Sequence, residues 1–158
     1  MNIILASNSP RRRELLGQMG LKDFQVSAPN VDETVEPGLS PAEMVEELSL
    51  RKARAASKKA GPEDLVIAAD TVVALDGKVL GKPRDREDAF AMLSALSGRE
   101  HRVYTGVTVL RGEEAATGHE ETTVAFRALE PGEIRGYIAT GEPMDKAGAY
   151  GIQGLGAL

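Results

Sequence analysis

Residues 65–80 read LVIAADTVVALDGKVL. The apolar run LVIAAD predicts a buried strand at 65–70, because short continuous apolar runs are typical of strands covered on both faces. The segment VVALDGKVL at 72–80 predicts a hairpin that turns at Asp76-Gly77, a pair suited to the positive φ angles of tight turns. A buried strand followed by a hairpin indicates a sheet that is at least partly antiparallel.

Strands and helices alternate along the rest of the chain, which favours an α/β or α+β fold. We expect further strands at 2–6, 102–110 and 121–129, and helices at 10–20, 40–60, 85–96 and 131–141. Serine followed by proline predicts the start of the first two helices, and Glu43 completes a capping box in the second. Since no internal repeat is evident, we expect residues 1–158 to form one domain. The sequence stops in an apolar, glycine-rich stretch, and we expect these 158 residues to be a domain that is truncated at its C-terminus.

The composition excludes several classes of site. The 158 residues include no cysteine and two histidines, which excludes disulfides, zinc–thiolate sites and cysteine nucleophiles. A metal would therefore have to bind carboxylates, which favours Mg²⁺ or Mn²⁺. The formal net charge of −5 and the aromatic content of 4% argue against a nucleic-acid polymer as partner. A single nucleotide needs only one local basic pocket.

No segment of the sequence predicts insertion into a membrane or secretion. No apolar run approaches the roughly 18 residues of a membrane helix. The run IILA at 3–6 is too short for the apolar region of a signal peptide. We therefore expect a cytoplasmic protein with no membrane partner, and the sequence leaves the oligomeric state, including a homodimer, open.

Three arginines occupy the first turn of the predicted helix at 10–20. With Ser9 as N-cap, Arg12 takes the third helical position, where a capping box has Glu or Gln. Cations at a helix N-terminus oppose its dipole, whereas free backbone N–H groups and guanidinium groups both favour an anion such as phosphate. The alternative is a solvated basic turn, and we expect Arg11 at least to face solvent.

Acidic residues in two segments are candidates for metal binding or proton transfer. Asp70 would lie at the end of the strand at 65–70, and ligands of α/β sheets gather at strand ends. Asp32 and Glu33 lie in a polar loop, and acids from distant segments can share one Mg²⁺ with substrate phosphates. The alternatives are a strand-end Asp that caps a turn and loop acids that are merely solvated.

Two lysines and one glutamine complete the candidate residues. Lys82 follows a glycine in a tight turn, and Lys52 falls on or near the apolar face of the helix at 40–60, where it either snorkels or points into a pocket. No GxxxxGK[ST] motif is present, which disfavours a P-loop enzyme. Gln153 lies in a loop rich in Gly and Pro and offers a donor and an acceptor to a base edge, unless it is a surface residue of a structural loop.

Taken together, these segments resemble the Maf nucleotide pyrophosphatases, also called septum-formation inhibitor proteins. Any one of the motifs is weak evidence, but seven of them in the order of the family are strong. The motif EPMDKAGAYGIQG and the Thr after Asp70 look like the dTTP/UTP branch of that family. The matching segments are ASNSPRRRELL at 6–16, VDE at 31–33, Lys52-Ala53, AADTVV at 68–73, GKP at 81–83, TGV at 105–107 and EPMDKAGAYGIQG at 142–154.

The resemblance implies an elongated, two-lobed α/β fold with a mixed sheet and a central cleft, like that of inosine triphosphate pyrophosphatases. It implies hydrolysis of dTTP and UTP, with modified pyrimidine nucleotides left open, to the monophosphate and pyrophosphate. The catalytic residues would be Asp70, Glu33, Lys52 and Lys82. Glu33 and Asp70 would hold Mg²⁺ or Mn²⁺, and Asp70 would accept a proton from the attacking water.

The resemblance also divides the remaining residues between phosphate and base. Ser9 and Arg13 would hold phosphates together with the two lysines. Arg12, Thr71 and Gln153 would set base preference. The alternative from another class is a nucleotide-binding regulator of cell division without turnover, against which the paired acids argue, because an unmetallated acid beside phosphates does not help binding.

Overall fold

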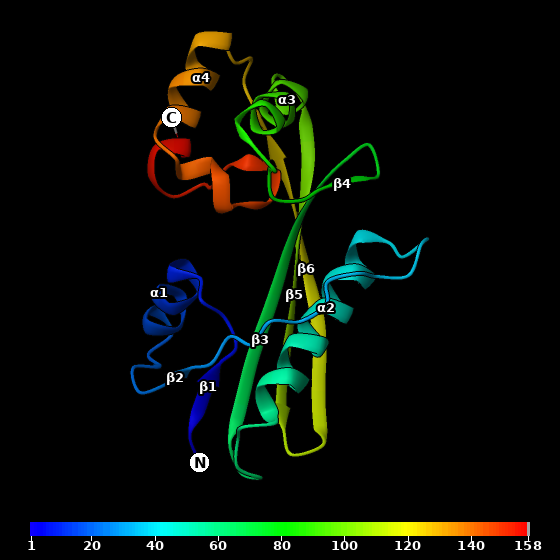
Figure 1. The fold of residues 1–158 in the computed structure, drawn as a ribbon, viewed down its shortest axis with the longest axis vertical. Coiled ribbons are helices and arrows are strands. Elements are labelled where there is room, and N and C mark those ends of the chain that lie inside the picture. The colour runs from blue at the N-terminus through cyan, green and yellow to red at the C-terminus, as the bar shows by residue number, and fades with distance from the viewer. Residues whose placement is uncertain (158) are drawn as a thin grey trace. The chain divides into compact units, whose positions relative to one another are not determined.

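The structure, a computed structural model, describes residues 1–157, which form a mixed α/β fold (Figure 1). Its strands are β1 (Ile3–Leu5), β2 (Gln25–Val26), β3 (Leu65–Leu75), β4 (Lys78–Leu80), β5 (Glu100–Arg111) and β6 (Glu114–Ala125). Its helices are α1 (Pro10–Gln18), α2 (Pro41–Ser57), α3 (Arg86–Leu96) and α4 (Pro131–Ala139), followed by short 3-10 helices at Glu142–Asp145, Ala147–Ala149 and Gly154–Ala157. Within residues 1–157, no helix is both long and apolar enough to span a bilayer.

The strands form one mixed sheet in the order β2-β1-β3-β5-β6, with β4 paired to β3. Strand β1 is parallel to both β2 and β3, whereas β3 and β4 form an antiparallel hairpin. The hairpin turns at Asp76 and Gly77, whose φ angles of 51° and 76° confirm the predicted turn. The prediction of a mixed sheet is therefore confirmed.

The chain divides into two compact units. The first unit comprises residues 1–70 and 105–120, and the second comprises residues 71–104 and the chain from Glu121 onward. Strand β3 passes from the first unit into the second between Asp70 and Thr71.

In the first unit, α2 packs against the sheet through small residues. Ala53 and Ala56 of α2 are buried in one cluster with apolar side chains of β1, β3 and β5. Gly106 of β5 lies against the α2 backbone, since a Cβ at this position would stand 2.2 Å from the carbonyl oxygen of Val45. A buried hydrogen bond of 2.8 Å also joins the hydroxyls of Ser49 on α2 and Thr108 on β5. The short side chains thus let the α2 backbone approach the sheet closely.

In the second unit, α3 and α4 pack on each other around an apolar cluster. The cluster is formed by Ala89 and Leu93 of α3 with Ile134 and Ile138 of α4, and Ala149 joins it. A neighbouring aromatic group connects the sheet to the loop after α4: the rings of His101, Phe126 and Tyr150 meet edge-on, with centroids 4.7–5.4 Å apart.

His101 is a buried titratable group, with 3% of its surface exposed. Its Nε2 lies 2.6 Å from the Tyr150 hydroxyl, while its buried Nδ1 has no hydrogen-bond partner among residues 1–157. Burial lowers the pKa of His101 and raises the pKa of Tyr150 to about 12. Both shifts favour the neutral form of the group concerned.

We expect the protein to lose stability as the pH falls below about 6.5, the pKa of histidine in an unfolded chain. Below this pH, His101 binds a proton in the unfolded chain but stays neutral in the folded protein. The free energy of unfolding therefore decreases until the pH passes the lower pKa of folded His101. Melting temperatures measured between pH 7.5 and 5 should fall less steeply in His101→Gln than in the wild type. Equal slopes in wild type and His101→Gln would contradict the expectation.

Three elements differ most from their predicted bounds. Strand β3 continues through Asp70 to Leu75, because residues 72–75 are also apolar and buried, so Asp70 lies within a strand and not at its end. Helix α2 ends at Ser57 and not at residue 60, although its capping box at Ser40 is confirmed. Strand β6 begins at Glu114 and ends at Ala125, in place of 121–129, because its exposed first half carries no apolar pattern.

Candidate active site

Helix α1 begins as its sequence predicts. Ser9 is the N-cap, and its hydroxyl accepts a hydrogen bond of 3.5 Å from the backbone N–H of Arg12. Arg11 and Arg12 are half-buried, whereas Arg13 is exposed. The expectation that Arg11 faces solvent stays a prediction. Arg12 lies four residues before the buried Leu16, which puts both on the face of α1 that meets the protein.

Arg12 reaches from α1 to strand β3. Its Nη1 donates to the carbonyl oxygen of Ala69 at 2.9 Å and to the hydroxyl of Ser7 at 3.2 Å. Ser7, which sequence reasoning did not single out, also accepts a hydrogen bond of 3.2 Å from the backbone N–H of Ser9. Burial lowers the pKa of Arg12, while the neighbouring Asp70 carboxylate raises it. The arginine at the third helical position is thus held beside Asp70.

Lys52 joins the two candidate carboxylates. Its ammonium forms an ion pair with Oδ1 of Asp70 and a second one, of 3.0 Å, with Oε1 of Glu33. Asp70 is buried, with 8% of its surface exposed, whereas the side chain of Glu33 is 62% exposed. The side chain of Lys52, 17% exposed, therefore ends at two carboxylates and does not extend into solvent, and its place in a pocket stays a prediction.

Four predicted residues thus meet within the first unit, each brought from a different element: Arg12 from α1, Glu33 from the loop before α2, Lys52 from α2 and Asp70 from β3. Two carboxylates that share one cation offer the hard oxygen atoms that Mg²⁺ and Mn²⁺ prefer. The Lys52 ammonium shows that these oxygens can hold a positive charge between them. No group of three or more His, Cys, Asp or Glu suited to a metal ion occurs among residues 1–157.

In the second unit, the GKP turn and the motif at 142–154 lie side by side. The backbone N–H of Gly148 donates to the carbonyl oxygen of Gly81 at 3.1 Å. Gly148 has a φ of 70°, and a Cβ there would stand 2.7 Å from a methyl carbon of Val73, so a side chain is excluded twice. Lys82, next to this contact, is exposed.

The loop that carries Gln153 is fixed through Glu142, a residue that sequence reasoning missed. The Glu142 carboxylate accepts hydrogen bonds from the Tyr137 hydroxyl at 3.0 Å and from the backbone N–H groups of Leu155 and Gly156 at 3.2 and 3.3 Å. Gln153 itself is exposed. Its predicted role, like those of Lys82 and the half-buried Thr71 in the same unit, stays a prediction.

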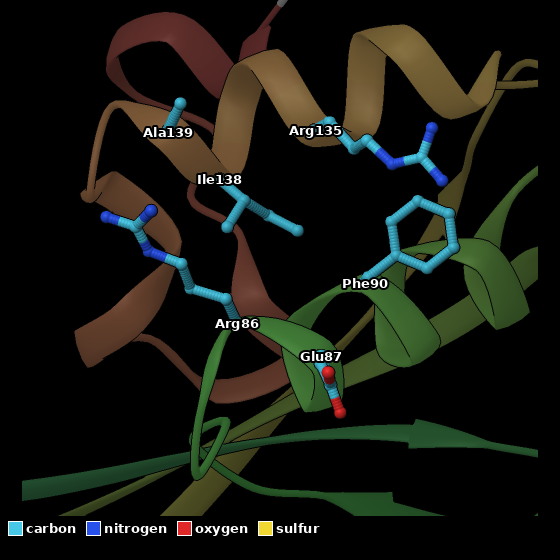
Figure 2. A pocket seen from close by; sticks show the side chains of 6 residues that line it. All are labelled: Arg86, Glu87, Phe90, Arg135, Ile138 and Ala139. Carbon is cyan, nitrogen blue, oxygen red and sulfur yellow. The ribbon is translucent and has the colours of Figure 1, made fainter.

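A separate pocket of about 450 Å³ lies in the second unit between α3 and α4 (Figure 2). Arg135 stacks over the ring of Phe90 at 5.1 Å, and Arg86 lies beside Ile138 and Ala139 at the C-terminal end of α4. Arg135 therefore already has a cation–π partner in this pocket. None of the predicted site residues lines this pocket.

Comparison with known proteins relates nearly the whole chain to one family. The family described as Maf-like protein matches residues 2–158. A protein of Symbiobacterium thermophilum named dTTP/UTP pyrophosphatase is 57% identical over 155 residues, which cover 98% of this chain and 79% of the relative. A protein of the same name from Pelotomaculum thermopropionicum is 55% identical over 98% of this chain and 81% of its own length.

Solved structures support the fold. The Ham1 protein of Staphylococcus aureus aligns with a TM-score of 0.53 at 20% sequence identity, over 78% of this chain and 70% of that one. This likeness agrees with the mixed α/β fold that the resemblance implied. On the match across residues 2–158 and on relatives more than half identical, the chain belongs to the Maf-like protein family.

Proposed function

We propose that this protein is a nucleoside triphosphate pyrophosphatase that hydrolyses dTTP and UTP to the monophosphate and pyrophosphate. The observation that carries the proposal is the buried Asp70, paired with Lys52, whose ammonium also contacts a second carboxylate, Glu33. The same name, dTTP/UTP pyrophosphatase, is carried by relatives 57% and 55% identical to this chain. We also propose that residues 1–158 act as one domain and that the protein works in the cytoplasm.

The proposed reaction consumes one water molecule. The water oxygen forms a new bond to the α-phosphorus. The anhydride bond between the α- and β-phosphates breaks, and pyrophosphate leaves. Asp70 accepts the proton that the water loses. Ser9, Arg13, Lys52 and Lys82 bind the phosphates. The arginine and the two lysines offset part of the triphosphate's roughly four negative charges, as cations do in other phosphoryl-transfer sites.

Glu33 and Asp70 would hold the divalent cation, Mg²⁺ or Mn²⁺. Their oxygens already share the ammonium of Lys52, and a metal ion competes with that ammonium for the same atoms. When bound, such a cation lowers the pKa of a coordinated water and stabilises charge on the phosphates. Lys52 would contribute its positive charge to binding of the substrate phosphates.

Base preference is assigned to Arg12, Thr71 and Gln153. We expect Gln153→Ala to change the order of preference among bases while leaving the metal requirement unchanged, because an exposed amide offers paired donor and acceptor groups to a base edge. The measurement is kcat/KM for dTTP, UTP, dCTP and dGTP with Mg²⁺ in both proteins. A uniform loss across all bases would instead assign Gln153 to phosphate binding or to the loop.

The function itself is tested by pyrophosphate release from canonical, methylated and deaminated nucleotides, with Mg²⁺, with Mn²⁺ and with EDTA. Metal-dependent release from dTTP or UTP supports the proposal, and the modified nucleotides define its breadth. Tight nucleotide binding with no product after long incubation would reject the enzyme in favour of a binding regulator.

A further inference from the structure

Glu33 lies in a segment without regular structure. Residues 27–40 include no helix or strand, yet the proposed metal site needs the Glu33 carboxylate at a fixed place beside Lys52. The ion pair of 3.0 Å does not explain this order, because the Glu33 side chain is 62% exposed. Exposed ion pairs contribute little to stability, whereas ordering the backbone of each loop residue costs conformational entropy. Another contact must hold the loop.

That contact comes from Arg51, the residue before Lys52 on α2. Its Nη1 donates to the carbonyl oxygen of Asp32 at 2.5 Å and to the carbonyl oxygen of Thr34 at 2.8 Å. These two carbonyls flank Glu33 on both sides. The Nη2 atom donates to Oε1 of Glu47 at 3.0 Å. Glu47 lies one turn before Arg51 on α2, and its carboxylate orients the guanidinium.

The loop closes on itself at the same place. The backbone N–H of Thr34 donates to Oδ1 of Asp32 at 2.9 Å. The turn spans Glu33 and bends the chain so that the carbonyls of Asp32 and Thr34 both face one guanidinium. A single planar group thus contacts the backbone before and after the carboxylate.

We propose that Arg51 is a positioning residue that fixes Glu33 by holding the backbone on either side of it. Arg51 binds the main chain of the loop, whereas its neighbour Lys52 pairs with the Glu33 side chain. Arg51 is not a catalytic residue, since its hydrogen bonds go to the loop and to Glu47. Its effect on metal binding and turnover rests on the proposed function, whereas its hold on the loop does not.

The alternative is that Arg51 only stabilises α2 through its surface ion pair with Glu47. Exposed ion pairs between residues four apart on a helix contribute little to stability. Such a pair has no reason to affect the order of residues 32–34 or the affinity of Glu33 for a cation. The two roles therefore differ in what happens to the loop when Arg51 is replaced.

The first test needs no nucleotide. In Arg51→Met we expect the Thr34 amide to exchange with deuterium about tenfold faster or more, because its hydrogen bond opens with the loop. Mn²⁺ binding, followed by electron paramagnetic resonance, should weaken about tenfold or more, as it does when supporting residues of other metal sites are lost. Arg51→Lys keeps the charge but not the planar fork, and we expect intermediate values for both measurements.

Arg54→Met is the matched control, because it removes the same charge from an exposed position one turn further along α2. It should leave Thr34 exchange and Mn²⁺ affinity unchanged. Wild-type values for both measurements in Arg51→Met would overturn the proposal. An equal rise in Thr34 exchange and an equal loss of Mn²⁺ affinity in Arg54→Met would also overturn the proposal. Both changes would then result from the reduced charge of α2 and not from the contacts of Arg51.

The second test separates this proposal from the proposed function. In a pyrophosphate-release assay, Arg51→Met should need about tenfold or more Mn²⁺ for half-maximal rate while kcat at saturating Mn²⁺ stays near that of the wild type. A loss of kcat without a change in metal requirement would overturn the positioning role. If the wild type releases no pyrophosphate, the proposed function fails, and the exchange and Mn²⁺ measurements still decide on Arg51.

Discussion

Replacing Asp70 by Asn should lower pyrophosphate release by about 10²–10⁴-fold, the usual contribution of a general acid or base. The amide keeps the size of a side chain that is 8% exposed, so the surrounding structure should be retained. It cannot accept a proton from water, and it loses charge as a metal ligand. Nucleotide binding should remain largely intact, because the phosphate contacts are assigned to other residues. The measurements are steady-state release with Mg²⁺ and nucleotide affinity by calorimetry.

Asp76→Asn is the matched control for this experiment. Asp76 lies six residues further along the same hairpin, in an exposed turn with a φ of 51°, a conformation that Asn also adopts readily. It should retain full activity. Near-wild-type turnover in Asp70→Asn would remove Asp70 from its proposed role, and loss of binding together with turnover would make it a ligand for the nucleotide complex.

Local patterns in the sequence predicted local structure well. The capping box at Ser40, the N-cap at Ser9 and the Asp76-Gly77 turn are confirmed, because each depends on a few consecutive residues. The apolar pattern did not predict the length of strand β3, because two polar residues interrupt it. Asp70 and Thr71 read as the end of a strand, yet β3 continues for four buried residues beyond them.

The candidate site depends on contacts that no local pattern encodes. Lys52 and Asp70 are 18 residues apart, and Arg12 and Ala69 are 57 apart, so their meeting depends on how α1, α2 and β3 pack. Sequence reasoning grouped these residues only through the resemblance to a family. It missed Arg51, because its partners are backbone carbonyls, which leave no trace in residue identities.

Gly106→Ala should destabilise the protein by about 3 kcal/mol, the upper range for overpacking a core. A Cβ at this position would stand 2.2 Å from the carbonyl oxygen of Val45, 2.4 Å from its carbon and 2.8 Å from the nitrogen of Glu46. All three are backbone atoms of α2, so a side-chain rotation cannot relieve the contact and the helix itself must move. The melting temperature should fall by roughly 6–12 °C at this chain length.

Gly118→Ala is the control for this prediction. Gly118 lies on β6, and no atom of residues 1–157 outside its immediate chain neighbours comes within 4 Å of the position its Cβ would take. It should change the free energy of unfolding by no more than about 0.5 kcal/mol. An equal loss in both variants would assign the effect to glycine in a strand and not to the contact with α2.

The displacement in Gly106→Ala should also reach the candidate site. Helix α2 carries Lys52, and Gly106 sets how closely that helix packs on β5. Because the ion pairs of Lys52 with Glu33 and Asp70 require close approach, a shift of α2 should lower activity even at temperatures where the variant is fully folded. Normal activity in a folded but destabilised variant would show that the helix returns to its place and that β5 yields instead.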